Sequence, residues 1–104
     1  RSFLYIDECI EGIHRIMNSD YNKPINLGSE RMISINELVL LIASLINKTV
    51  TIKNINGPVG VMGRRSDNRL LEQIMGWKPA EDLETGLVKT YHWINSQIGK
   101  NNDQ

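Results

Sequence analysis

Two adjacent arginines and a nearby carboxylate are the residues of this chain best suited to binding chemistry. The stretch Gly63-Arg64-Arg65-Ser66-Asp67-Asn68 places both guanidinium groups on a loop before a short apolar helix. An arginine fork can hold two phosphate oxygens, and the free N–H groups of a helix start add positive potential. Asp67 can accept a hydrogen bond from a sugar hydroxyl. The spacing therefore suits a nucleotide diphosphate with its ribose, although a solvated charged loop in which Asp67 caps the next helix explains the same residues.

The arginine loop stands within an ordered series of motifs. The series consists of R-S-F-x-x-I-D-E-C-x-E-G at 1–12, P-I-N-L-G at 24–28, the Gly-rich stretch and loop at 57–68, G-W-K-P at 76–79 and L-x-x-G-L at 83–87. In this order it resembles the C-terminal part of the extended short-chain dehydrogenase/reductase superfamily, the NAD-dependent sugar-nucleotide epimerases and dehydratases. The first motif and G-R-x-S-D-N are most similar to the GDP-mannose 3,5-epimerase family. The resemblance covers roughly residues 1 to 98.

This resemblance implies a fold and a division of the chain. The expected class is α/β, as the C-terminal fragment of a Rossmann-type enzyme that carries the small substrate-binding α/β lobe. Residues 1–30 would end the nucleotide-binding domain, residues 31–76 would form the substrate-binding lobe, and residues 77–104 would supply a closing helix and a polar tail. The chain begins with Arg1 rather than Met, which fits the interior of a longer protein.

The resemblance also implies an activity for the whole enzyme. NAD would transiently oxidise the sugar at C4, a proton would leave and return on the other face, and reduction would restore the hydroxyl. Arg64 is the residue expected to bind the diphosphate. Arg1 is expected to contact the substrate as part of its pocket. Ser66 and Asp67 are further candidates for substrate binding. Arg65 is expected to point to solvent.

The catalytic parts of such an enzyme are not found in this sequence. The superfamily needs a G-x-x-G-x-x-G loop after its first strand and a Tyr-x-x-x-Lys pair. The glycine spacing occurs here only at 57–63, late in the resemblance and not after a first strand, and no Tyr-x-x-x-Lys pair occurs. Cys9 lies beside two glutamates and is expected to be inert. We expect no catalytic, cofactor-binding or metal-binding residue in this chain, NAD to be held by the part before it, and the isolated chain to be inactive.

Three alternatives compete with this interpretation. One is a non-catalytic binding or oligomerisation module of the same fold. A second keeps the enzyme class but makes it an NDP-sugar 4-epimerase or 4,6-dehydratase, since the R-x-x-D loop is shared. A DNA-binding helix-turn-helix from residues 34–47 and 68–75 is disfavoured, because a strand and a Gly-rich loop replace the short turn.

The amino-acid composition limits the kinds of binding partner that this chain can be expected to have. The 104 residues carry 12 basic and 12 acidic side chains, for a formal net charge of zero. Nucleic-acid and anionic-membrane binders need a basic excess, so neither partner is expected. The longest purely apolar run, 38–43, is too short to span a bilayer, and a single cysteine fits a reducing cytoplasm. A homodimer is expected, because the first helix has an apolar face without a partner in this chain.

Periodicity predicts the elements that must hold the arginine loop. Residues 2–6, 25–27 and 49–55 are predicted strands, and residues 7–17, 35–46, 68–75 and 83–98 are predicted helices. Asp7, Ser34 and Asp82 are predicted to cap helices, and Gly76 to stop one in a left-handed conformation. Residues 99–104 are expected to fray.

Overall fold

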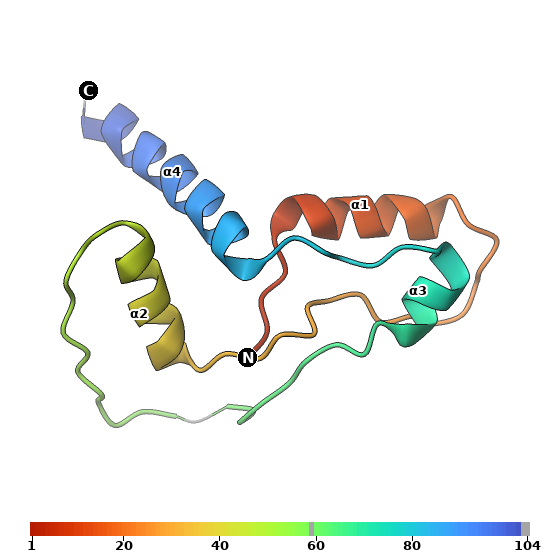
Figure 1. The fold of residues 1–104 in the computed structure, drawn as a ribbon, viewed down its shortest axis with the longest axis horizontal. Coiled ribbons are helices and arrows are strands. Elements are labelled where there is room, and N and C mark those ends of the chain that lie inside the picture. Colours follow the sequence, from red (N-terminus) through yellow and green to blue (C-terminus); the bar gives the residue numbers. More distant parts are fainter. Residues whose placement is uncertain (59, 103–104) are drawn as a thin grey trace.

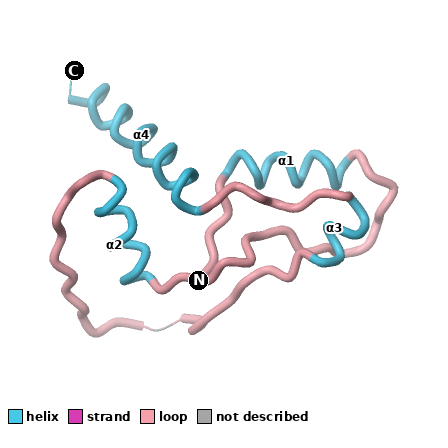
Figure 2. The backbone as a smooth tube through the Cα atoms, viewed as in Figure 1, coloured by secondary structure: helices cyan, strands magenta, loops and turns pink. Residues whose placement is uncertain are grey.

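The computed structural model describes residues 1–58 and 60–102, and within them the regular structure is helical (Figure 1). Long loops connect the helices, and none of the described residues belongs to an assigned strand (Figure 2). The helices are α1 at Ile6–Met17, α2 at Ile35–Leu45, α3 at Arg69–Met75 and α4 at Leu83–Asn102.

Three predicted helix ends are confirmed by their hydrogen bonds or backbone angles. The Ser34 hydroxyl accepts a hydrogen bond from the N–H of Glu37 at 3.0 Å, which satisfies a free donor at the start of α2. Asp82 does the same before α4, accepting from the N–H of Thr85 at 2.9 Å. Gly76 ends α3 with φ at 63°, in the left-handed region where a side chain is unfavourable.

Two predicted helix boundaries are wrong. α1 begins at Ile6, after an N-cap residue, Tyr5, whose side chain makes no capping bond. Asp7 therefore lies inside the first turn, where a carboxylate is still stabilised by the helix dipole. α4 continues to Asn102, so residues 99–102 are helical rather than frayed, with Lys100 favourably placed in the last turn. The remainder of the expected frayed tail, 103–104, lies outside the described residues.

The predicted strands do not form in the described part of the chain. Residues 2–6, 25–27 and 49–55 lie in loops, so the α/β description is not confirmed. A strand is defined by the ladder that it makes with its neighbours, and β-branched composition cannot supply that partner. One reciprocal backbone pair is present: the N-terminal amine of Arg1 donates to the Ile33 carbonyl at 3.0 Å, and the Ile33 N–H donates back at 2.8 Å.

The structure is open and buries little apolar surface. Its radius of gyration is 16.9 Å, whereas a compact domain of this length has about 13 Å. Among the described residues, the buried apolar side chains are Ile33, Ala43 and Leu71. One face of α1 is exposed instead, with 48% to 77% of the area accessible at Ile6, Ile10, Ile13 and Met17.

Residues 28–33 lie between two other segments and fix the position of the arginine loop. On one side Ile33 pairs with Arg1. On the other side the N–H of Ser66 donates to the Ser29 carbonyl at 3.0 Å. Figure 1 shows this segment between the N-terminus and the loop that leads into α3. The two regions that hold the predicted substrate-binding residues are therefore attached to one common segment.

Candidate anion-binding cleft

An open cleft of about 370 Å³ lies where the arginine loop meets the residues before and after Gly28. Two of the four predicted substrate-binding residues, Arg64 and Ser66, line it. Its other walls carry polar, small and leucine side chains from the first residues of the chain and from the 26–29 segment. The complete lining is Ser2, Leu4, Asn26, Leu27, Gly28, Ser29, Arg64, Arg65 and Ser66.

The arginines of the chain fall into two groups. Three are bound to carboxylates at 2.7 or 2.8 Å, in the pairs Arg15–Glu11, Arg31–Glu84 and Arg69–Asp67. Within residues 1–58 and 60–102, the other three have no carboxylate within the 4.0 Å of an ion pair: Arg1, Arg64 and Arg65. Two of these line the cleft, and the third lies against the Gly-rich stretch that precedes them. The arginines left over from internal pairing are therefore grouped around the loop at 60–66, whereas lysines that form no ion pair among the described residues, such as Lys23, Lys48 and Lys53, lie elsewhere in the chain.

Arg1 reaches this region through its side chain. A Cβ built on Gly60 would lie 2.9 Å from Nη2 of Arg1, so the guanidinium rests against the backbone of the Gly-rich stretch. Gly60 leaves that space free. Arg1 is not among the residues that line the cleft, and it is exposed. The structure brings Arg1 to the stretch that leads into the cleft, but not into the cleft itself.

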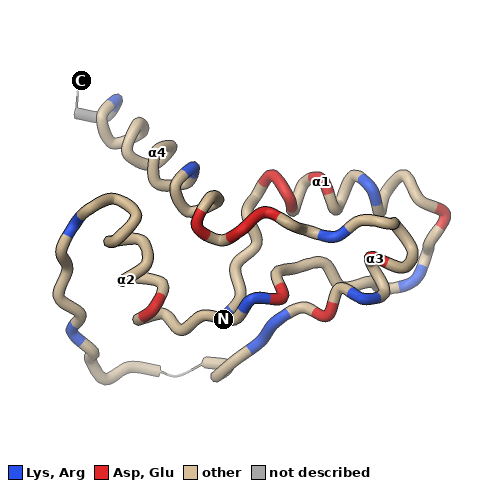
Figure 3. Tube along the Cα trace, viewed as in Figure 1, with Lys and Arg blue, Asp and Glu red and all other residues tan. Residues whose placement is uncertain are grey.

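Arg65 is exposed to solvent, as expected, but it also borders the site. It lines the same cleft as Arg64, and both residues are exposed. Figure 3 shows the two positive residues just before Asp67 on the way to α3.

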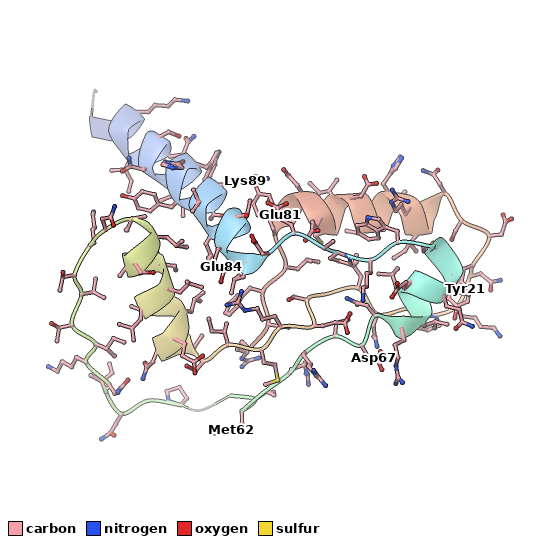
Figure 4. The ribbon with its side chains drawn as sticks, viewed as in Figure 1. Tyr21, Met62, Asp67, Glu81, Glu84 and Lys89 are labelled. Atoms are coloured by element: carbon pink, nitrogen blue, oxygen red, sulfur yellow. The ribbon has the colours of Figure 1, made fainter. Side chains whose placement is uncertain are left out.

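Asp67 is bound to a neighbour and does not line the cleft. Its carboxylate accepts a hydrogen bond from Nη2 of Arg69 at 2.7 Å and from the Arg69 backbone N–H at 3.1 Å. The Arg69 side chain and then its backbone N–H lower the pKa of Asp67 from 3.8 to about 2. Figure 4 shows Asp67 at the end of the loop, next to α3. The alternative in which Asp67 supports the start of this helix therefore describes its observed contacts.

The loop is fixed to the rest of the chain by a buried asparagine. Asn68 is 1% exposed, and its Nδ2 donates to the Gly28 carbonyl at 2.7 Å. Its Oδ1 accepts a hydrogen bond from the Ser66 hydroxyl at 2.6 Å. Asn68 holds the N-cap position of α3 but makes no side-chain bond to that helix. Its side-chain amide instead forms hydrogen bonds to Gly28 and Ser66.

Sequence reasoning missed several cleft residues. Ser2, Asn26 and Ser29 border the cleft with groups that can form hydrogen bonds. Ser2 and Asn26 belong to motifs that were recognised, but their uncharged side chains gave no chemical signal comparable to that of an arginine. Ser29 follows Gly28 and is identified only by its position opposite Ser66.

A second cleft, of about 430 Å³, lies between the start of α1 and the start of α4 and is lined mainly by apolar residues. The charged side chains that line it already have partners, several of them just outside the lining. Both carboxylate oxygens of Glu84 accept hydrogen bonds from Arg31 at 2.8 Å. Nearby, Lys89 donates to Glu81 at 2.8 Å (Figure 4). An anion would have to break these pairs, so the smaller cleft is the better anion site.

The described residues contain no helix long and apolar enough to cross a membrane. They also contain no group of three or more His, Cys, Asp or Glu residues that could hold a metal ion.

Comparison with known proteins identifies the class of enzyme to which this chain is related. No family model matches the chain. Curated relatives are enzymes named for nucleotide sugars, among them UDP-glucuronic acid decarboxylase 1 of Xenopus tropicalis, which is 31% identical over 99 residues, or 94% of this chain and 24% of the relative. The chain is therefore homologous to part of an extended short-chain dehydrogenase/reductase enzyme.

Relatives named GDP-mannose 3,5-epimerase have a higher sequence identity to this chain. GDP-mannose 3,5-epimerase 1 of Oryza sativa subsp. japonica is 46% identical over 104 residues, which are 100% of this chain and 28% of the relative. GDP-mannose 3,5-epimerase of Arabidopsis thaliana is 47% identical over 100 residues, 96% of this chain and 26% of the relative. The resemblance seen in the motifs is confirmed. The chain spans about a quarter of the length of these relatives.

Proposed function

We propose that this chain is the substrate-binding part of an NAD-dependent sugar-nucleotide epimerase of the GDP-mannose 3,5-epimerase type. The observation that carries the proposal is the distribution of arginines: those that have no carboxylate partner among the described residues gather at the cleft or at the loop leading to it. A diphosphate supplies the negative oxygens that such groups bind, and a planar guanidinium can hold two of them. The relatives named GDP-mannose 3,5-epimerase match the whole chain.

Within this proposal each residue has its own task. Arg64 binds the diphosphate from the wall of the cleft, and Ser66 adds a hydroxyl beside it. Arg1 contributes from beside the Gly-rich stretch, and Asp67, ionised at neutral pH, binds a sugar hydroxyl in exchange for part of its bonding to Arg69. Fixing a substrate in a reactive geometry can lower a barrier by about 7–11 kcal/mol. The contribution of this chain to catalysis is positioning.

The glycine spacing at 57–63 matches G-x-x-G-x-x-G, but its surroundings do not favour a dinucleotide site. The glycines at 57, 60 and 63 follow no assigned strand, and α3 begins only at Arg69. A dinucleotide loop requires a strand that turns directly into a helix. NAD would therefore be held by other residues of the enzyme, where it would supply the oxidation at C4 of the sugar that makes epimerisation possible.

The proposal extends to the organisation of the enzyme. Residues 1–30 end its nucleotide-binding domain, residues 31–76 form the substrate-binding lobe and residues 77–104 close it. In the complete α/β enzyme, the segments at 2–6 and 25–27 would find strand partners outside this chain. The enzyme is a cytoplasmic homodimer that binds neither nucleic acid nor membranes, in keeping with the balanced charge and the single cysteine.

Substitution of Arg64 in the full-length protein tests the proposal. Arg64→Ala should weaken GDP-mannose binding about ten- to a hundredfold, because a charge-assisted hydrogen bond contributes about 1.5–3 kcal/mol. NAD affinity should change little. Arg64→Lys should recover only part of the loss, since an ammonium lacks the planar fork. Isothermal titration calorimetry with each ligand measures both affinities.

Arg15→Ala is the matched control. It removes the same charge from an exposed position on α1, outside the cleft, so GDP-mannose affinity should stay within about twofold of the wild type. Equal losses at Arg64 and Arg15 would mean that bulk charge, not a site, attracts the substrate. A protein that binds UDP-glucuronate more tightly than GDP-mannose would instead favour the UDP-glucuronic acid decarboxylase relatives.

A further inference from the structure

The loop that carries Arg64 is attached to the rest of the chain at three successive places. Near its start, a Cβ built on Gly63 would lie 2.7 Å from Cε of Met32. In the middle, the N–H of Ser66 donates to Ser29 at 3.0 Å. At its end, Asn68 donates to the Gly28 carbonyl at 2.7 Å. The two arginines of the cleft therefore stand between anchored residues on both sides.

Asn68 is the strongest of these attachments. Its side chain is almost completely buried, and both ends of its amide are used, one toward Gly28 and the other toward the Ser66 hydroxyl. A buried amide that loses a partner is left with an unpaired polar group, which is expensive. Asparagine is also a strong N-cap residue, yet here its side chain makes no bond to α3. The side chain contributes to the loop rather than to the helix.

The approach of the loop to Gly28 is close. A Cβ built on Gly28 would lie 2.9 Å from Cβ of Ser66, a distance that real Cβ atoms do not tolerate. Only a residue without a side chain allows the loop to reach the position in which Asn68 bonds to the Gly28 carbonyl. Glycine at 28 and asparagine at 68 thus specify the same loop position from opposite sides.

We propose that Asn68 is a positioning residue for the substrate arginine: it holds residues 64–66 against Gly28 so that the Arg64 guanidinium faces the diphosphate. The inference rests on the proposed function of Arg64. Asn68 lines no part of the cleft and acts on the substrate only through Arg64. Releasing it should let the loop leave the cleft wall, so that part of the binding energy is used to restore its position.

The test is a double-mutant cycle in the full-length protein, with GDP-mannose binding measured by calorimetry at saturating NAD. Asn68→Ser keeps a good N-cap residue and adds no charge, but it removes the amide that bonds to Gly28. It should weaken GDP-mannose binding about tenfold, while NAD affinity stays within twofold. Combined with Arg64→Ala, it should add less than a twofold further loss, since its effect passes through that arginine.

Several outcomes would overturn the inference. GDP-mannose affinity unchanged in Asn68→Ser overturns it, and so does a tenfold loss that persists in the Arg64→Ala background. An equal loss of NAD and GDP-mannose affinity would show a general structural role. If Arg64→Ala itself has no effect, the proposed function fails along with the inference, whereas a normal Arg64→Ala loss with a silent Asn68→Ser removes the inference alone.

Two further variants complete the experiment. Asn36→Ser makes the same chemical change at an exposed position in the first turn of α2 and should bind both ligands like the wild type. If Asn68→Ser does not fold, Asn68→Asp preserves the side-chain volume and still accepts from Ser66, but it cannot donate to Gly28. It should show the same coupling to Arg64, and additive losses in this pair would overturn the inference equally.

Discussion

The carboxylate of Glu8, in the first turn of α1, accepts a hydrogen bond of 2.7 Å from the backbone N–H of Ala80. The same oxygen accepts a second bond, also 2.7 Å, from the N–H of the next residue, Glu81. A single side chain thus connects the beginning of the chain to the segment that precedes α4. Both amides depend on a partner 72 or 73 residues away in sequence.

The first prediction is that Glu8→Ala frees these two amides. Hydrogen exchange at Ala80 and Glu81 should become at least about tenfold faster in the full-length protein, because bonds to a charged acceptor contribute about 1.5–3 kcal/mol. Amide exchange followed by mass spectrometry or NMR measures this change. Glu11→Ala, which breaks an exposed i,i+4 ion pair on the same helix, should leave both amides unchanged. Unaltered exchange in Glu8→Ala would contradict the role of this contact.

The second prediction contrasts two glycines that both have free space around them. A Cβ on Gly76 or on Gly99 would meet no atom within 4 Å. Gly76 has φ at 63°, so Gly76→Ala should destabilise the protein by about 1–2 kcal/mol. Gly99 lies inside α4, so Gly99→Ala should be neutral or stabilise by up to about 1 kcal/mol. The midpoint of thermal unfolding should fall in Gly76→Ala and stay equal or rise in Gly99→Ala, and a fall in both variants would refute the assigned conformations.

The third prediction concerns the pH dependence of the ion pair at the end of the arginine loop. Because the pKa of Asp67 is lowered from 3.8 to about 2 in the folded chain, its pairing with Arg69 contributes fully only well above pH 3.8. The contribution should be lost as the pH falls toward 2. An NMR titration of the carboxyl carbon should show a midpoint near 2 that returns toward 3.8 in Arg69→Ala. A midpoint that ignores Arg69 would exclude this pair as its cause.

The fourth prediction is that the 104-residue chain by itself associates through α1. Ile6, Ile10, Ile13 and Met17 form an apolar face that is about half or more exposed, and burial against a second molecule would remove it from water. Analytical ultracentrifugation should show a dimer that Ile10→Lys weakens. Ile55→Lys is the control, since Ile55 is 80% exposed on a loop away from α1. A cooperatively melting monomer would refute the prediction.

The sequence predicted best those features that a few neighbouring residues determine. Ser34, Gly76 and Asp82 were located correctly because a cap or a left-handed stop depends on local hydrogen bonds and φ. The strands failed for the opposite reason. A β-branched run such as 49–55 needs a partner to complete its ladder, and the described residues supply none. The sequence pattern of these residues predicts a strand whether or not that partner is present.

The site was predicted in part. The arginine pair was found because its charge and spacing carry a chemical signal, but the sequence could not show that Arg65 borders the cleft beside Arg64. It could not show either that Asp67 is occupied by Arg69, since several residues on this loop could have paired with that carboxylate. Asn68 belongs to the G-R-x-S-D-N motif, but nothing in that motif indicates its burial. The burial depends on the 28–33 segment, forty residues earlier in the chain.

The long connection from α2 to the arginine loop has a consequence for how such a protein can change. Ile55 and Met62 on this connection are 80% and 87% exposed, and a Cβ on Gly57 would touch nothing. The arginines, by contrast, take their position from Met32, Ser29 and Gly28. Residues inserted near Gly57 would lengthen the connection at a small entropic cost, about 0.6 kcal/mol per doubling of loop length. This connection can therefore change in length and composition while the two arginines of the cleft keep their position.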